Sequence, residues 1–286
     1  MLQAIDELLH MEYNFIKGFF QKEIQKTMKV RENAICEGQY MFDILNTKLS
    51  DDAIKDKRKE VSKRLQLKSV NINSGTINTI SAADLKLLFK LYDEIFLENW
   101  FEESFRGKLK FSLSRQMTKS AGLTRCPKNI HTIKPEEVVI EIKIGVDFFF
   151  HYGLIEGNKM VGGVDTQNSL EALQLVFEHE LCHVIEFIHF GKSNCGRERF
   201  KTMAGSLFGH TESHHKLPTH RQIANQKLGL NIGDTVTFTY EGVRHTGILY
   251  NINKRATVMV RNENGPLADR QGRRYSKYYV PLKLLE

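Results

Sequence analysis

Hydrophobic residues recur at helical spacing in the first part of this chain of 286 residues. One such stretch lies around Ile5 to Phe19 and a second around Ile35 to Leu49, so residues 1 to about 65 are expected to be helical. The run from Asp51 to Lys68 mixes both charge signs, which favours a solvated helix face over a nucleic-acid-binding arm. The polar stretch from Asn71 to Ser81 is typical of a linker.

A new unit is predicted to begin at Ser81, which with Asp84 has the pattern of a helix cap. Hydrophobic residues from Leu85 to Phe96 then follow helical spacing, and Gly107 ends this pattern. Three strand-like segments come next, at Leu109–Ser114, Gln116–Thr124 and Val138–Ile144. The middle of the chain is therefore expected to combine helices with a small sheet.

The longest helical pattern in the chain follows a glycine-bearing loop. Asn168 or Ser169 can cap its start, and Gly191 ends it. Its hydrophobic stripe consists of Leu170, Leu173, Phe177, Leu181, Val184 and Ile188. Since that stripe faces a core, the polar residues on another strip of the helix are expected to look away from the packing surface. These residues are His179, Glu180, His183 and Glu186.

The sequence HELCH, residues 179 to 183, carries the clearest chemistry. On a helix, His179 and His183 stack on one face, where two imidazole nitrogens can hold a zinc ion. Glu180 lies within reach of a zinc-bound water and is the candidate general base. The pattern predicts a zinc-dependent hydrolase that cleaves protein substrates, whereas the alternative is a pair of ordinary core histidines. Helix, short sheet and metal helix is also the order of a zincin-type core, where a sheet edge can hold an extended peptide.

Composition limits the class of protein. The hydrophobic content of 41% is sufficient for a packed core, and no run of 18 apolar residues or signal-peptide pattern is present. The four cysteines lie far apart without a CxxC pair, so we expect reduced thiols in a cytoplasmic protein that is not bound to a membrane. The net charge of +7 weakly favours an anionic partner, with DNA as the first candidate and a nucleoid-associated location if DNA is bound.

Five segments together resemble the SprT-like domain, the metalloprotease core shared with the Spartan proteases. They are LYDEIFLENWF (91–101), FSLSRQMTKSAGL (111–123), VVIEIKI (138–144), FEHELCHVIEFIHFG (177–191) and RERFKTMAGSLFG (197–209). The resemblance covers roughly residues 84 to 215. It implies an α+β, zincin-like fold and zinc-dependent proteolysis, and the Spartan branch of the family acts on proteins crosslinked to DNA.

The third zinc ligand departs from that family pattern. SprT-like domains usually supply a His from an HGxxF/W motif that opens the next helix, but this position is Gly196 here. Cys195 comes immediately before it, and zinc accepts Cys sulfur readily. His210 is the alternative third ligand, and His214 and His215 are candidates of lower rank. A structural thiol and a surface histidine cluster are the non-metal interpretations.

The carboxyl-terminal segment has the pattern of a separate module. From Gly233 onward, apolar and polar residues alternate with turns at Glu241-Gly242 and Asn264-Gly265, which predicts a small antiparallel barrel. It resembles the SH3-like (KOW or Tudor-like) barrels attached to SprT-like proteins. Its candidate DNA contacts are Lys254, Arg255, Arg270, Arg273, Arg274 and Lys277, interleaved with Tyr275, Tyr278 and Tyr279. The alternative places the tyrosines in the barrel core and the charges on its solvated rim.

The sequence thus predicts three parts: a helical region over 1–80, a zincin-like domain over 81–222 and an SH3-like barrel over 228–286. Three functions fit this organisation. The first is a DNA-associated zinc protease, the second a general zinc peptidase with a protein-binding barrel, and the third a catalytically silent, zinc-stabilised nucleic-acid-binding scaffold.

Overall fold

The computed structural model describes residues 42–286, of which Ile44–Glu286 form one compact unit with an α+β fold. The first predicted helix and residues 35–41 of the second lie outside the described residues. Residues 44–46 form a turn, so the prediction of a helix that continues to Leu49 is wrong there. The first described helix is α2, Asp51–Lys68, which begins where the Ser50 side chain accepts a hydrogen bond from the backbone N–H of Ala53.

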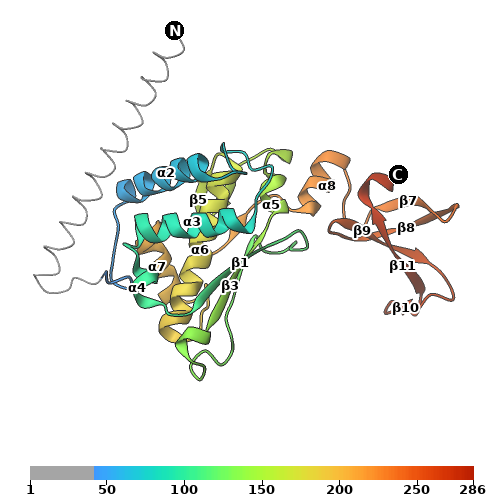
Figure 1. The fold of residues 1–286 in the computed structure, drawn as a ribbon. Helices are drawn as coiled ribbons and strands as arrows, with labels where there is room; N and C mark the ends of the chain where they lie inside the picture. Colours follow the sequence, from blue (N-terminus) through green and yellow to red (C-terminus); the bar gives the residue numbers. More distant parts are fainter. Residues whose placement is uncertain (1–41) are drawn as a thin grey trace, which may run out of the picture. The chain divides into compact units, whose positions relative to one another are not determined.

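Helix α2 has the solvated face that its mixed charges predict. It fully buries Ile54, Val61 and Leu65, while most of its charged residues are exposed. Arg58 is an exception, because its side chain reaches the buried Glu178. Helix α3, Ala82–Phe96, packs beside it (Figure 1) and starts at the capping box of Ser81 and Asp84, as the sequence predicts. Short helix α4, Trp100–Ser104, follows.

The connection between α2 and α3 is packed and is not a free linker, so that prediction is wrong. Ile72 and Ile77 are each 1% exposed. The backbone N–H of Ile77 donates to Ser169 Oγ at 2.7 Å, and the N–H of Leu170 donates to the Gly75 carbonyl at 3.0 Å. Two isoleucines in a polar stretch are enough to anchor it to the start of the long helix α6, Ser169–Phe190. Contacts therefore run across residue 80, where the sequence predicts a domain boundary.

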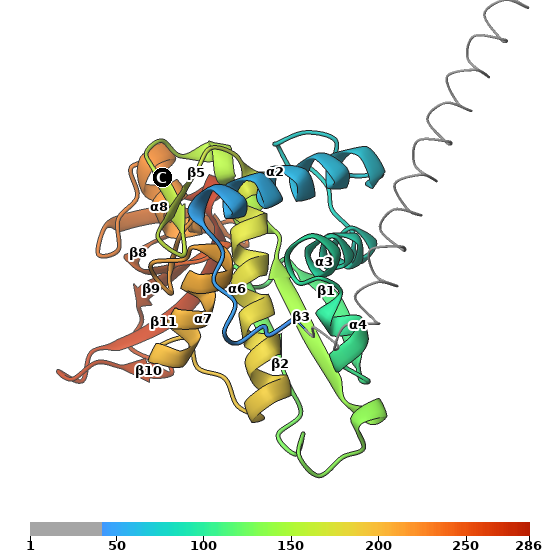
Figure 2. The same ribbon diagram turned by 90° about the vertical axis from the view of Figure 1, so that its left-hand side faces the viewer.

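A three-stranded sheet lies between α3 and α6, as Figure 2 shows. Its order is β1 (Lys108–Ser114), β3 (Val139–Gly145) and β2 (Gly122–Arg125), with β1 parallel and β2 antiparallel to β3. The predicted strand over 116–124 is thus shorter and shifted to its carboxyl end. Ile140, Ile142 and Ile144 alternate along β3 and are fully buried, whereas β2 forms an edge of the sheet.

Helix α6, Ser169–Phe190, runs along the whole core in Figure 2. The Asn168 side chain accepts a hydrogen bond from the N–H of Glu171 at 3.0 Å, and Gly191 ends the helix with φ +63°. Both ends were predicted from the sequence, because capping residues act locally.

The remaining core elements surround α6. They are α5 (Asp147–Phe150), β4 (Lys159–Val161), β5 (Val164–Thr166), α7 (Glu198–Phe208) and β6 (His215–Lys216). Strand β4 pairs with both β5 and β6, and the pairing of Val161 with His215 brings the chain back toward α6 after α7. This return positions residues 210–215 against the core.

The carboxyl-terminal part is a five-stranded antiparallel sheet and not a closed barrel. Its strands are β7 (Thr235–Tyr240), β8 (Val243–Ile252), β9 (Arg255–Arg261), β10 (Leu267–Ala268) and β11 (Arg274–Pro281), in the order β10-β11-β9-β8-β7. Within the described residues, β10 and β7 are the outermost strands of this sheet. Thr237 and Glu286 exchange two backbone hydrogen bonds, but no strand ladder closes the sheet. Helix α8, His220–Leu228, contributes Ala224 to its core.

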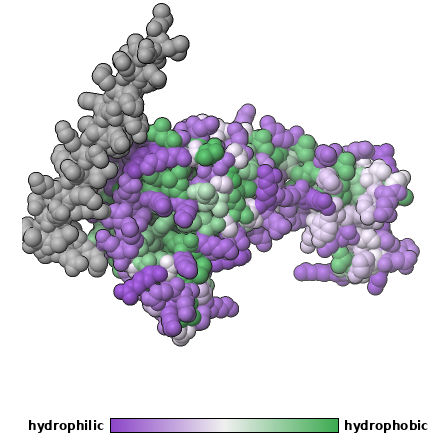
Figure 3. All heavy atoms as spheres, viewed as in Figure 1, coloured by the Kyte–Doolittle hydropathy of each residue, from purple (hydrophilic) through white to green (hydrophobic). Residues whose placement is uncertain are grey.

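The surface drawn in Figure 3 is mostly hydrophilic, with separate hydrophobic patches. Among the described residues, no helix is both long and apolar enough to cross a bilayer.

Candidate metal centre

Helix α6 presents the HELCH residues to a covered face and not to open solvent. His179 is 4% exposed, Glu180 is 3% exposed and Glu186 is fully buried. The expectation that these side chains look outward is therefore wrong for His179, Glu180 and Glu186, whereas His183 is half-buried. Edge strand β2 packs along this face of α6, and the Phe200 ring of α7 lies against it, so the helix is buried on both sides.

The two motif histidines face each other. His179 Nε2 and His183 Nε2 are 3.2 Å apart, and the Phe200 ring lies 4.8 and 4.6 Å from the two imidazole centroids. Burial lowers the pKa of His183 to about 4 and brings the pKa of His179 well below its usual range. Both rings are therefore neutral at physiological pH, the form in which imidazole nitrogen binds a metal.

Cys195 is the third residue of this group. One ligand atom each from His179, His183 and Cys195 lies within 4.8 Å of the others. Cys195 belongs to the loop between α6 and α7, and its carbonyl accepts a hydrogen bond from Ser213 Oγ at 2.7 Å. Burial raises the pKa of the thiol, so a thiolate here depends on a nearby cation such as a bound metal ion.

His210, the alternative third ligand, is held elsewhere. Its Nε2 lies 2.9 Å from Glu178 Oε2, and the same carboxylate binds Arg58 and Tyr92. Glu178 and His210 are both buried. The structure thus brings Cys195, and not His210, to the histidine pair.

His215 also lies beside the two motif histidines, and the strand pairing that places it there was not predicted from the sequence. Its ring centroid is 4.9 Å from that of His179, and its buried Nδ1 has no hydrogen-bond partner among residues 42–286. Burial lowers its pKa to about 4. His214 instead has a 77% exposed side chain, 3.8 Å from Glu212. The position of His215 depends on the β4–β6 pairing, and two residues are too short a strand for periodicity to detect.

Glu180 is oriented by β2. Thr124 Oγ1 donates a hydrogen bond of 2.6 Å to Glu180 Oε2. Gly122 provides the necessary space, because a Cβ at that position would lie 2.3 Å from Glu180 Oε1. Burial raises the pKa of Glu180 to about 7, even though the Thr124 hydrogen bond acts in the opposite direction.

His179, Glu180, His183 and Cys195 share one cleft of about 460 Å³. Residues 119–124 form one of its walls and include the start of edge strand β2, while residues 213–215 form another. A peptide in this cleft would lie beside a strand edge that has no partner among the described residues.

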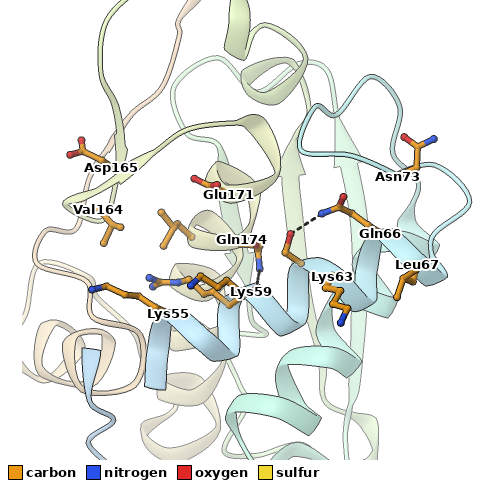
Figure 4. Close-up of a pocket in the computed structure, with 13 residues that line it drawn as sticks. Lys55, Lys59, Lys63, Gln66, Leu67, Asn73, Val164, Asp165, Glu171 and Gln174 are labelled. Carbon is orange, nitrogen blue, oxygen red and sulfur yellow. Dashed lines mark hydrogen bonds between the residues drawn. The ribbon is translucent and has the colours of Figure 1, made fainter. Parts of the chain in front are cut away.

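A second hollow of about 620 Å³ lies between α2 and the start of α6 (Figure 4). Lys55, Lys59 and Lys63 project from α2, while Glu171 belongs to the opposite side. Gln174 bridges the two helices by donating to the Arg58 carbonyl at 3.0 Å. Among residues 42–286, the group with metal-ligand geometry lies in the other cleft, so we place the candidate chemistry there.

Three of the six predicted DNA-contacting cations form an ion pair or a hydrogen bond within the protein. Arg273 pairs with Asp269 at 2.7 Å, and Arg274 donates to the Gly265 carbonyl at 3.0 Å. Lys254 Nζ lies 2.7 Å from Asp147 Oδ2.

The other cations and the tyrosines of this sheet differ in exposure. Lys277 lies 5.4 Å from the ring centroid of Tyr279, which is 59% exposed. Tyr278 packs against Phe238 in the core of the sheet. Arg255 and Arg270 are exposed and form no ion pair within the described part of the chain.

The sequence matches no protein-family model, no curated protein and no solved structure. The SprT-like and SH3-like resemblances therefore rest on the motifs alone.

Proposed function

We propose that this chain is a zinc-dependent metallopeptidase of the SprT-like type, with a zincin-like core. The observation that carries the proposal is the convergence of His179, His183 and Cys195 beside Glu180 in one cleft.

The donor set fits zinc. Two neutral imidazoles and a thiol are ligands that zinc accepts in a tetrahedral site, and three protein ligands leave one position open, as in catalytic sites. His215, whose ring centroid is 4.9 Å from that of His179, is a further candidate donor. Zinc bound here would act as a Lewis acid that acidifies water and polarises the peptide carbonyl.

The protein residues around the cleft would do the remaining work. Glu180, held by Thr124, would accept a proton from the attacking water and pass it to the leaving amine. The free edge of β2 would align the substrate backbone by strand addition, which fixes the scissile bond without requiring a specific side chain.

Metal analysis combined with a Glu180→Gln variant tests this proposal. The parent chain should bind about one zinc and cleave casein or itself, and a chelator should stop cleavage. Glu180→Gln should keep the zinc and lose proteolysis, because Glu180 acts as a base and not as a ligand. A parent without zinc would contradict the metal site, and a fully active Glu180→Gln would contradict the role of the base. Zinc without cleavage would favour the silent scaffold.

DNA association is the second part of the proposal. The exposed Arg255 and Arg270, together with Lys277 beside exposed Tyr279, support it. Replacing Arg255 and Arg270 by Ala in the full chain should reduce the slope of log K against log salt for duplex DNA by about two. No affinity of the parent for DNA at low salt would favour the general peptidase with a protein-binding sheet.

A further inference from the structure

Glu186 lies one turn beyond His183 on α6 and is fully buried. Its Oε1 accepts from Arg199 Nε at 2.6 Å. Its Oε2 accepts from Ser193 Oγ at 2.6 Å and from the backbone N–H of Asn194 at 3.1 Å. One buried carboxylate therefore binds two groups in the loop between α6 and α7, at Ser193 and Asn194, and one in the first turn of α7, at Arg199.

The Ser193 hydroxyl has a second contact, because His183 Nδ1 lies 2.6 Å from Ser193 Oγ. A hydroxyl carries one proton, and a carboxylate can only accept. Ser193 therefore donates its proton to Glu186 and must accept from His183. This direction puts the His183 proton on Nδ1 and leaves a lone pair on Nε2, the atom that faces His179 Nε2.

The same carboxylate also fixes the loop that carries the sulfur donor. Asn194, whose N–H is bound to Glu186, directly precedes Cys195. The segment is held at both ends, since Gly191 begins it with positive φ and Arg199 anchors the first turn of α7. Cys195 is thereby placed within 4.8 Å of the histidine pair.

We propose that Glu186 is a positioning residue of the metal centre, acting through Ser193 on His183 and through Asn194 on Cys195. It sets the His183 tautomer whose Nε2 can bind metal, and it holds the loop at a fixed distance from α6. The proposal rests on the zinc site of the proposed function, but the tautomer it predicts is a property of the metal-free chain.

Two variants of the full chain test the hydrogen-bond direction. Ser193→Ala removes the acceptor for His183 Nδ1. Glu186→Gln introduces an amide that can donate to Ser193, so the hydroxyl turns its proton toward His183 and moves the ring proton to Nε2, the metal-binding atom. Each variant should bind zinc about 10- to 100-fold more weakly, measured by competition with a chromophoric chelator. Ser193→Thr, which keeps the hydroxyl, should restore the parental affinity to within about twofold.

Ring ¹⁵N shifts of His183 in the metal-free protein give the independent readout. The parent should show the Nδ1–H tautomer, and Glu186→Gln should shift the population toward Nε2–H. A matched control is Glu178→Gln, an equally buried glutamate of the same helix whose partners are Arg58, Tyr92 and His210. It should change zinc affinity by no more than about twofold.

The possible failures can be told apart. Parental zinc affinity in both Ser193→Ala and Glu186→Gln, or an unchanged His183 tautomer in Glu186→Gln, would overturn the positioning role. A parent that binds no zinc would overturn the proposed function, whereas the tautomer measurement would still decide the role of Glu186.

Discussion

The contact between Arg58 and Glu178 should be among the strongest single stabilising interactions of the core. Arg58 donates from Nε and Nη2 to the two oxygens of Glu178 at 2.7 and 2.6 Å, and Nη2 also donates to the Phe208 carbonyl. The Glu178 side chain is 0% exposed and that of Arg58 is 17% exposed. Burial alone would raise the pKa of Glu178, but the Arg58 charge and the hydrogen bonds from His210 and Arg58 outweigh it, so the pKa lies below its usual value.

Arg58→Met keeps most of the apolar part of the side chain but removes the guanidinium and its charge. Glu178 would then be a buried carboxylate with only Tyr92 and His210 as partners. Breaking a buried ion pair on one side costs about 3–5 kcal/mol, which in a unit of this size lowers Tm by about 6 to 20 °C. The cost comes mainly from the charge left behind and not from the loss of attraction.

Arg64→Met is the matched control. Arg64 lies on the same helix and makes a bidentate contact with Glu94 at 2.9 and 2.9 Å, but the two side chains are 25% and 50% exposed. Its loss should cost less than about 1 kcal/mol. Urea and thermal unfolding of the full chain measure both variants, and adding Glu178→Gln to Arg58→Met should recover about 1–3 kcal/mol by removing the stranded charge.

Two results would refute this reasoning. If Arg58→Met costs no more than Arg64→Met, burial does not determine the strength of the pair. If adding Glu178→Gln only increases the loss, the stranded carboxylate is not the source of the cost.

Three further predictions concern the metal centre. Gly122→Ala should displace Glu180 and lower proteolysis about 100-fold while zinc content, measured by atomic absorption, stays at the parental level; a drop in zinc would show that the site itself had moved. Cys195→Ala should lower zinc occupancy, whereas His210→Ala should not. Parental zinc occupancy in both variants would point to His215 as the third ligand. In the chelated protein, the pKa of His183 and that of His215 are each about 4 in the folded state and 6.5 in the unfolded state. Between these two values the unfolded state binds more protons, so the free energy of unfolding should fall as the pH falls. The fall should be up to about 1.4 kcal/mol per pH unit for each histidine. Urea unfolding at pH 7, 6 and 5 measures this fall, and His183→Gln should reduce the slope by about one proton; a flat profile would contradict the buried neutral state.

Short-range sequence patterns predicted the helix and the strands around the candidate metal centre. The ends of α6 follow from Asn168 and Gly191, and the histidine face follows from their spacing of four. Alternation located β1 and β3 to within a residue at each end. These features depend on neighbours within a few positions, and so they can be inferred from a single sequence.

The surroundings of α6 depend on contacts that are distant in sequence. Strand β2 covers the second face of the helix although it lies more than 40 positions earlier, and His215 arrives through a two-residue strand. The polar stretch before α3 packs because Ser169 and Gly75 offer hydrogen bonds that its composition does not reveal. Alternation likewise predicted the carboxyl-terminal strands but not whether their edges meet, because closure depends on strand tilt and stagger.

The three buried glutamates of α6 differ in whether they form an ion pair with a cationic side chain. Glu178 has Arg58 and Glu186 has Arg199 as cationic partners. Glu180 has a hydroxyl from Thr124 and, among the described residues, no cation in an ion pair. A buried carboxyl without a positive partner has its pKa raised, here to about 7, so it can exchange a proton near neutral pH. The two paired carboxylates hold the helix and the loop in place, and the one without a cationic partner, beside the histidines, is the group fitted to proton transfer.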